Sequence, residues 1–445
     1  MPITDIHPAH AAALQGWARL RDCVAGEEAV KARRAEYLPR PGGQTERAYR
    51  AYLARAVWYG ATERTLRGLV GAIFRHPPVV EAPKSLLARL DDLAPDGRPF
   101  ETLALAVTRE TALLGRHGLL VDRPAKGAGD PYLASYPAEA ICDWQLGLRE
   151  GRQRLVRLVL QEADETYREL LLDSAGHYRV RLWRRKGPRG TAYAIAEEHR
   201  PTRDGQPLEV IPFVFLGASN TGPAIEKPPL ADLAGMNLAH YRNSADYEQS
   251  LFLTGQPTPW ISGRLEARER PNAIGSGTIW YLPEGCQTGM LEFTGAGIEA
   301  LRQAMLDKEA RMVQLGARLL EAPKRAAETA EAVRLRGEAE ASTLSVLAQS
   351  VGRGLTQALR HLAWWRGLDP TQETGGVTVR LNSDFVEARL SAPELQALVA
   401  AWQAGAISRR TLYDNLRDGE IVPPSRSFEE EQEMVQSQPL EEVAE

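Results

Sequence analysis

The chain has only three cysteines in 445 residues, and they lie far apart. Cys23, Cys142 and Cys286 form no CxxC pair and no even set, so we expect neither a disulfide framework nor a thiolate metal site. A reducing compartment or an intracellular assembly therefore fits this sequence better than secretion.

Long apolar runs are also missing. No stretch of ~18 apolar residues occurs, so no transmembrane helix is expected. The first ten residues, M-P-I-T-D-I-H-P-A-H, lack the basic-then-apolar order of a signal peptide. These two observations predict a protein without membrane contact.

The motifs of common enzyme classes are absent as well. The chain has no G-x-x-x-x-G-K-[ST], no G-x-S-x-G and no H-E-x-x-H. Acidic pairs such as Asp91 with Asp92 are adjacent, so on a regular element their carboxylates point apart and make poor acid/base partners. We expect a non-enzymatic protein that needs no cofactor or metal.

Charge of one sign is not in excess. The formal net charge is −4, with 43% hydrophobic and 25% charged residues, which is ordinary for a globular chain with several domains. This balance argues against sequence-specific DNA reading. It is compatible with weak contact to DNA that slides, because firm phosphate binding would hinder sliding.

The most regular part of the sequence runs from Leu230 to Gly367. Apolar residues at helical spacing, with prolines before and Gly255 after, predict a helix over 230–253. A second helix is predicted over 298–320. Residues 254–297 between them are rich in Gly, Pro and β-formers, which favours three short strands.

The second helix carries a narrow apolar stripe at near-heptad spacing. Its packing residues are Leu301, Met305, Met312, Leu315 and Leu319. A stripe this narrow suits neighbouring helices in a ring better than the wall of one compact domain. The strand-rich tip is interpreted as a docking surface, with aromatic residues and a charged rim. That surface comprises Trp260, Arg264, Arg268, Arg270, Trp280 and Tyr281.

A charged, Ala-rich segment follows the second helix. Residues 321–336 begin a stretch that Pro323 interrupts, and four basic residues stand in it: Lys324, Arg325, Arg334 and Arg336. The segment can be an exposed helix with i,i+4 ion pairs, or a loop that approaches phosphates. A long helix is predicted to follow, ending at Trp365, and an alternating strand at 377–385 could return to an earlier sheet.

The first 229 residues read as helical up to about 118 and as β-rich over 119–229. The strand His177–Arg185 alternates apolar and basic residues, and residues 147–203 hold thirteen Lys or Arg against eight Asp or Glu. This basic face can meet an acidic neighbour or be a solvated sheet face. Residues 391–428 predict helices, and the acidic residues 429–445 predict a frayed tail.

The order of these segments resembles a family, the bacteriophage portal proteins, which are head-to-tail connectors. Y-L-P followed by a helix that ends in G-A-I-F-R-H-P-P, and G-A-I-S-R-R-T-L near the C-terminus, are similar to a portal-like conserved phage domain family. The resemblance covers nearly the whole chain, and its motifs are structural. It implies an α+β portal-like fold with these parts: a mixed helical and β wing (1–229), two stem helices (230–253 and 298–320), a β clip (254–297), a tunnel loop (321–336), a long central helix with a returning wing strand (337–390), a helical crown (391–428) and an acidic tail (429–445).

The resemblance also implies a function. It predicts a ring, usually of twelve subunits, at one capsid vertex of the virion, assembled in the host cytoplasm. Double-stranded DNA would pass through it during packaging, retention and ejection. The implied partners are the terminase large subunit, a head-tail adaptor, and the major capsid and scaffolding proteins. Lys324, Arg325, Arg334 and Arg336 would face the DNA.

Two alternatives remain open from the residues alone. The same helices could assemble an oligomeric scaffold that encloses no DNA. A hydrolase with a dispersed active site is a third possibility, which would require a pocket with convergent titratable groups.

Overall fold

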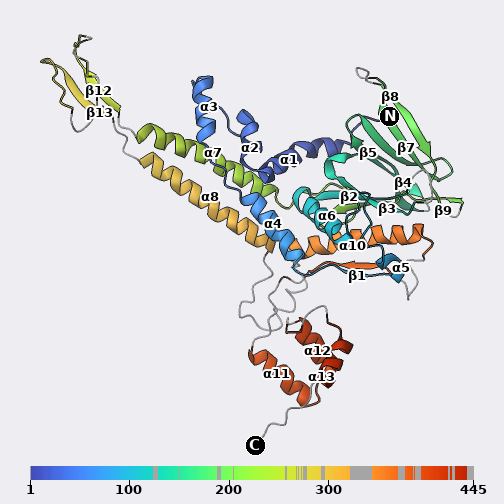
Figure 1. Cartoon of the computed structure of the whole chain (residues 1–445). Coiled ribbons are helices and arrows are strands. Elements are labelled where there is room, and N and C mark those ends of the chain that lie inside the picture. The colour runs from blue at the N-terminus through green and yellow to red at the C-terminus, as the bar shows by residue number, and fades with distance from the viewer. Residues whose placement is uncertain are drawn as a thin grey trace, which may run out of the picture. The chain divides into compact units, whose positions relative to one another are not determined.

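The computed structural model describes residues 2–437 with gaps at 124–128, 150, 188–191, 204, 256–257, 267, 269, 272, 274–277, 292–295, 321–342, 369–375, 384, 386–391, 419–420 and 423–425. The chain divides into two compact units, Met1–Ser383 and Asp384–Glu445. Figure 1 shows the elements of both.

The first unit is α+β, as predicted. Its first half contains α1 (Pro8–Ala25), α2 (Glu27–Ala32), α3 (Glu46–Arg55), α4 (Ala61–Ile73), β1 (Val79–Glu81), α5 (Lys84–Leu87), α6 (Phe100–Leu114), β2 (Arg116–Asp122), β3 (Tyr132–Pro137) and the short 3-10 helix η2 (Ala138–Ala140). The strands β4 (Ile141–Arg149), β5 (Arg152–Ala163), β6 (Thr166–Leu172), β7 (Tyr178–Arg185), β8 (Tyr193–His199), β9 (Thr202–Arg203), β10 (Gln206–Pro207) and β11 (Phe213–Gly217) follow. Thr45 caps α3 by accepting a hydrogen bond from the Ala48 amide at 3.2 Å, as its place after two glycines predicts.

The strands form several separate sheets. β4 to β8 make a five-stranded antiparallel meander, and β2 is the centre of a three-stranded sheet in the order β11-β2-β3. β14 (Thr378–Arg380) pairs antiparallel with β1, Val80 opposite Val379. As expected, this strand pairs within residues 1–229, but its partner is β1 in the helical part and not a strand of the β-rich part over 119–229.

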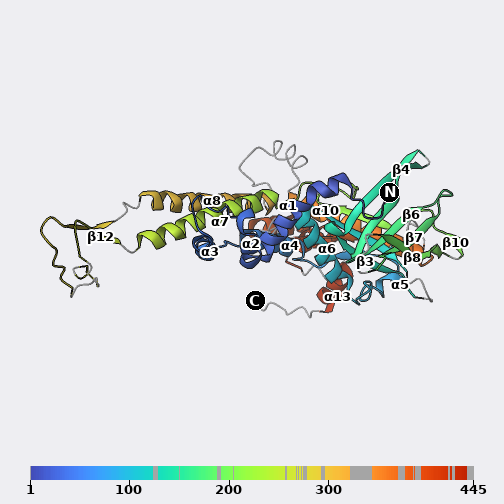
Figure 2. The ribbon, with the colours of Figure 1, turned by 90° about the horizontal axis from the view of Figure 1, so that it is seen from above.

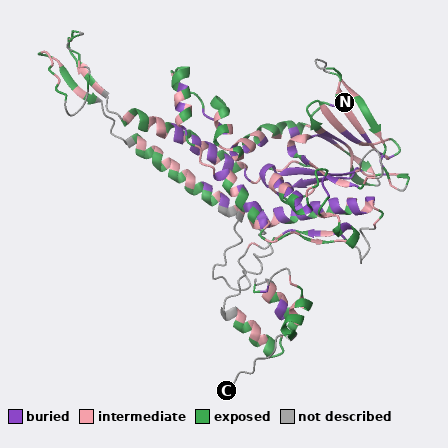
Figure 3. Ribbon diagram, viewed as in Figure 1, coloured by how far each residue is buried: buried purple, intermediate pink, exposed green. Residues whose placement is uncertain are grey.

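The core lies between the three-stranded sheet and two helices, α6 and α10 (Thr343–Trp365). α10 lies against β11 so closely that a Cβ on Gly354 would stand 2.8 Å from Leu216 Cδ2. The Ser350 hydroxyl donates to the Gly217 carbonyl at 2.9 Å at the same crossing. Most of α10 is therefore buried (Figure 3). The predicted end of this helix is confirmed at Trp365, and its predicted start lies outside the described residues.

Two long helices, α7 (Ala231–Thr254) and α8 (Ala296–Leu320), run side by side in both views (Figures 1 and 2). Each differs from its predicted bounds by at most two residues. His240 of α7 is 3% exposed, and its Nε2 lies 3.0 Å from a Glu309 carboxylate oxygen of α8. The two helices are thus joined by a polar contact as well as by apolar packing.

The stripe predicted on α8 lies on its inner side. Met312 is 2% exposed, and Leu301, Met305, Leu315 and Leu319 are half-buried. α7 is the helix that contacts α8 most extensively. Four of the five stripe residues keep part of their surface exposed. Their packing against a neighbouring subunit therefore stays a prediction.

The segment between α7 and α8 holds two strands in its described part, β12 (Thr258–Ser262) and β13 (Gln287–Leu291), paired antiparallel. Of the three predicted strands, the middle one is wrong, because residues 278–283 are irregular. The Trp280 indole N–H donates to the Ala273 carbonyl at 2.8 Å. That bond closes a local loop, so Trp280 is held by a turn of its own segment.

The second unit consists of α11 (Ala392–Gln403), α12 (Arg409–Asp418) and α13 (Phe428–Ser437). Ser408 caps α12 by accepting a hydrogen bond from the Thr411 amide at 3.0 Å. The prediction of a frayed tail over 429–445 is wrong for its first part, which belongs to α13. Ser427 accepts from the Glu430 amide at 3.1 Å while the Glu430 carboxylate accepts from the Ser427 amide at 2.7 Å, a capping box that begins α13. The rest of the predicted tail, 438–445, lies outside the described residues.

Candidate functional site

The β12–β13 hairpin exposes apolar side chains. Trp260 is 42% exposed and Tyr281 is 85% exposed, and Ile279 and Met290 are exposed as well. Trp260 is fixed on its strand because its ring lies against Gly289, where a Cβ would stand 3.0 Å from the indole. Large exposed aromatic side chains of this kind are typical of binding surfaces.

Two of the predicted docking residues share a pocket. Arg270 and Trp280 line a pocket of about 700 Å³ together with Pro259, Ile261, Gly263, Leu265, Pro271 and Ala273. Trp260 lies between Pro259 and Ile261 on the strand and is not part of this lining, as strand alternation requires. Arg268 pairs with Glu266 at 3.0 Å, and the Arg264 carbonyl lies 3.7 Å from Cys286 Sγ. The structure thus brings Arg270 and Trp280 together in one pocket.

A second exposed apolar surface lies on α8, and sequence reasoning missed it. Leu306 is 43% exposed and Val313 is 66% exposed, and Ala310 between them is exposed too. Their spacing of three and four residues places them on one face of the helix. We call Leu306, Ala310 and Val313 the outer α8 face. The helical spacing of these three residues can be seen in the sequence. The prediction used only the longer apolar stripe on the other side of the same helix.

Apolar side chains are also exposed at the end of α7. Leu251, Phe252 and Leu253 are all exposed, and the Arg55 guanidinium lies 3.5 Å from the centre of the Phe252 ring. Three consecutive apolar residues cannot all face one partner helix, so α8 alone cannot cover them.

The residues predicted to approach DNA, Lys324, Arg325, Arg334 and Arg336, lie outside the described residues. The helices on either side of them are described. α8 and α10 contact each other, and each contacts α4. At one of these contacts Gly316 of α8 approaches Thr65 of α4, where a Cβ would stand 3.3 Å from the hydroxyl. The helices that precede and follow the segment 321–342 therefore contact each other.

The basic face predicted on β7 is neutralised within its own sheet. Arg179 pairs with Asp173 at 2.8 Å and with Glu198 at 3.2 Å, and Arg181 lies 3.4 Å from Glu198. Each arginine therefore already has a carboxylate partner across the strands. Of the two alternatives for this basic face, the pairing does not support contact with an acidic neighbour.

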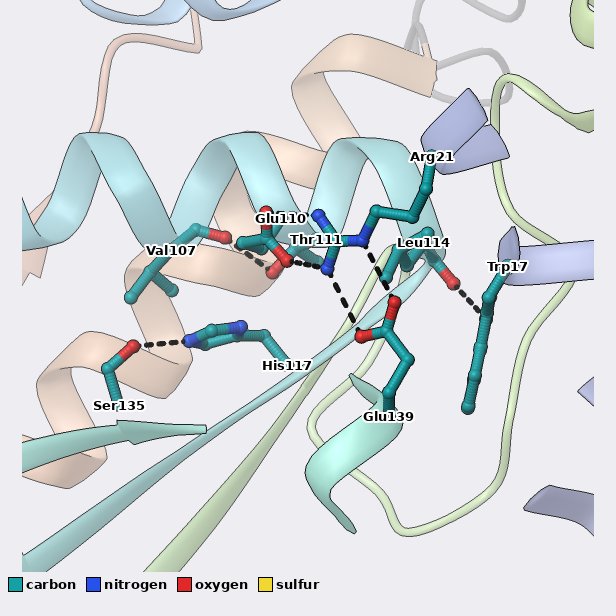
Figure 4. A network of polar contacts seen from close by, with 9 residues as sticks. All are labelled: Trp17, Arg21, Val107, Glu110, Thr111, Leu114, His117, Ser135 and Glu139. Carbon is teal, nitrogen blue, oxygen red and sulfur yellow. Dashed lines mark hydrogen bonds and ion pairs between the residues drawn. The ribbon is translucent and has the colours of Figure 1, made fainter. Parts of the chain in front are cut away.

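A polar network joins α1, α6 and η2 (Figure 4). The Arg21 guanidinium donates to both Glu110 oxygens, at 2.7 and 2.5 Å, and to both Glu139 oxygens, at 2.9 and 3.1 Å. In the same region, the Trp17 indole donates to the Leu114 carbonyl at 3.0 Å, and His117 Nε2 lies 2.8 Å from the Ser135 hydroxyl. Two carboxylates beside a histidine are the kind of set that a hydrolase would need.

The charges of this network hold its three elements together, because Arg21 pairs with both carboxylates. Burial alone would raise the pKa of Glu110, but the hydrogen bonds and charge of Arg21 lower it. Burial lowers the pKa of His117 to about 4, so the ring is neutral at pH 7. One arginine occupies both carboxylates, which leaves neither free to act as a general base.

A groove between α10 and β14 is a further site that sequence reasoning missed. It has a volume of about 650 Å³, and every charged side chain that lines it is an arginine: Arg353, Arg360 and Arg380. The signal was available, because α10 contains no Asp or Glu over its 23 residues. The sequence instead predicted DNA contact at residues 321–336, because that segment before α10 contains several charged side chains.

Within the described ranges, no group of three or more His, Cys, Asp or Glu could hold a metal ion. Over the same ranges, none of the helices combines the length and the apolar character needed to cross a bilayer.

Comparison with known proteins gives one family match. The family described as a domain of unknown function (DUF4055) matches residues 229–366, which begins just before α7 and ends just after α10. No curated protein matches the chain.

Among solved structures, the chain is similar to proteins of gene transfer agent (GTA) particles. A chain from the neck of an empty GTA particle has 15% identity and a TM-score of 0.42, with 91% of this chain and 99% of that chain covered. A chain from the virion of the native particle has 15% identity and a TM-score of 0.41, with 94% and 99% covered. A chain from the native neck has 16% identity and a TM-score of 0.41, with 86% and 97% covered.

Proposed function

We propose that this chain is the subunit of a phage-type portal ring, a non-enzymatic conduit for double-stranded DNA at one vertex of a capsid. The observation that carries the proposal is the outer α8 face. Leu306 and Val313 are exposed on a long helix whose inner side is already packed against α7, so a second apolar face remains for another copy. A closed ring covers such a face on every subunit at once.

The arrangement of the first unit also supports this function. In the portal interpretation, α7 and α8 are the stem, the β12–β13 hairpin is the clip, and α10 is the central helix. The exposed Trp260 and Tyr281 on the hairpin suit attachment of a motor or an adaptor. Residues 321–336, which follow α8, would be the tunnel loop.

The partners follow from the same proposal. They are further copies of this chain, twelve being the usual number in the portal family, together with DNA, the terminase large subunit, a head-tail adaptor, and capsid and scaffolding proteins. The site of action is the virion. The competing function is an oligomeric scaffold without DNA, which the same outer α8 face would also serve.

Ring formation is tested by introducing negative charges on the outer α8 face. The double variant Leu306→Asp with Val313→Asp should convert the wild-type ring into monomers or small oligomers, because burying two carboxylates in a subunit interface is unfavourable. Light scattering measures the mass, negative-stain images show the ring, and circular dichroism checks that the variant is folded.

The matched control is Leu148→Asp with Ile195→Asp, which makes the same chemical change at two exposed apolar residues of the five-stranded sheet. That variant should still form rings. A wild-type protein that is a monodisperse monomer at micromolar concentration would overturn the proposed function.

A further inference from the structure

The groove between α10 and β14 concentrates positive charge, because three arginines line it. Arg353 donates to the Ser219 carbonyl at 3.1 Å, and Arg360 donates to the Val377 carbonyl at 3.1 Å. Among the described residues neither arginine pairs with a carboxylate. Arg380 differs, because it pairs with Glu81. Two guanidinium charges are therefore left for a ligand.

The geometry of α10 presents both charges in one direction. Arg353 and Arg360 are seven residues apart, two turns of helix, or about 10 Å along its axis. Gln349 and Gln357 are exposed on the same side, and the lining also includes Thr356 and Ser383. The opposite side of α10 is buried against β11, which holds the helix and its arginines in place.

A peptide strand could not add to the sheet at this groove. The Val379 amide donates to the Thr356 hydroxyl at 2.9 Å, and Arg360 occupies the Val377 carbonyl. The edge of β14 that faces α10 is thus closed by side chains of the helix. The ligand must be recognised by side-chain donors alone.

The donors that remain are those that contact nucleic-acid phosphates. Guanidinium, amide and hydroxyl groups make most sequence-independent contacts to the phosphate backbone. The apolar side chains of the lining, Ala348, Val379 and Leu381, are buried. The lining contains no aromatic ring on which a base could stack.

We propose that the groove between α10 and β14 binds the phosphate backbone of DNA without regard to sequence, through Arg353 and Arg360. The inference rests on the proposed function for the identity of the polyanion. It places a DNA contact on the body of the first unit, on residues that are separate from the segment 321–336.

The test uses the full-length protein and a fluorescent DNA duplex of mixed sequence at low salt. The variant Arg353→Gln with Arg360→Gln keeps hydrogen-bond donors for the two carbonyls but removes both charges. We expect its affinity for the duplex to fall at least tenfold. The slope of log affinity against log salt should become shallower by roughly two, about one for each lost phosphate contact.

Two controls accompany this variant. Arg50→Gln with Arg67→Gln removes the same charge from exposed positions on α3 and α4 and should bind like the wild type. Arg353→Lys with Arg360→Lys keeps the charges and should retain most of the affinity. Equal binding by the wild type and the Arg353→Gln, Arg360→Gln variant would overturn the inference.

Competition decides the class of ligand. Polyglutamate that displaces the duplex at equal charge concentration would indicate an acidic protein segment and overturn the assignment to DNA. Ring formation is measured separately, by light scattering of the same samples. Rings without a charge effect refute the groove alone, whereas a charge effect on a protein that never forms rings refutes the proposed function alone.

Discussion

At the scale of single residues, the buried cationic side chains set limits on how the protein responds to pH. Arg116 is 1% exposed, and burial lowers its pKa to about 9. Its guanidinium lies over Trp144 and Phe215, with ring distances of 4.3 and 4.8 Å, and donates to the Pro223 carbonyl at 2.7 Å. The aromatic faces partly replace the carboxylate that a buried arginine normally has.

His117 makes the protein less stable in mild acid. Its folded pKa is about 4 against an ordinary value of 6.5, so the unfolded chain binds more protons between these two values. The stability that neutral His117 contributes is complete above pH 6.5 and is lost as pH falls toward 4, with a total loss on the order of 3 kcal/mol.

The prediction is that His117→Gln reduces this acid sensitivity. Urea unfolding at pH 7 and pH 5 should show a wild-type loss that is larger than the variant's by about 2 kcal/mol. An identical loss in both proteins would show that His117 does not titrate as its burial implies.

At the scale of elements, glycine has opposite roles in two of the helices. Gly354 lies where α10 crosses β11, with Leu216 Cγ and Cδ2 within 2.9 Å of where its Cβ would stand. Gly235 of α7 has no atom within 4 Å of the same position. The first glycine permits a close approach of helix and sheet, and the second only weakens its helix.

The same substitution should therefore change stability in opposite directions. Gly354→Ala is expected to destabilise the protein by about 1–3 kcal/mol, because Leu216 is buried and cannot easily move. Gly235→Ala should stabilise it by about 0.5–1 kcal/mol through helix propensity. Chemical denaturation at one protein concentration measures both, and a gain from Gly354→Ala would contradict the close packing of α10 on β11.

At the scale of the whole molecule, the portal proposal predicts separable effects on assembly and on DNA. Lys324 and Arg325 belong to the segment between α8 and α10, and each would contact phosphate in a channel. The variant Lys324→Ala with Arg325→Ala should form rings and empty capsids in normal yield, while packaging or retention of the genome falls.

The control for this prediction is Arg50→Ala with Arg67→Ala, which removes two positive charges from exposed helices. Normal packaging by both variants would favour the scaffold function. Loss of the ring in the Lys324→Ala, Arg325→Ala variant would instead make the segment 321–336 an assembly contact.

Much of the secondary structure could be predicted because local signals agree with one another. Prolines and glycines punctuate α7, Thr45 and Ser408 are good N-caps, and β7 alternates along its length. The α13 helix was also predictable in principle, since Ser427 and Glu430 have the spacing of a capping box. The long acidic run instead led to the prediction of a frayed tail, although acidic residues stabilise the first turn of a helix.

The sequence by itself determined the α+β class, the two long helices and the residues that form their apolar faces, because periodicity is a property of neighbouring residues along the chain. Only the tertiary structure decided that α7 packs against α8 and that β14 pairs with β1. It also decided that arginines of β7 meet carboxylates, whereas Arg353 and Arg360 meet none among the described residues. Those outcomes depend on contacts between residues far apart in the chain, and a pattern of residue types does not specify which of several compatible partners is met.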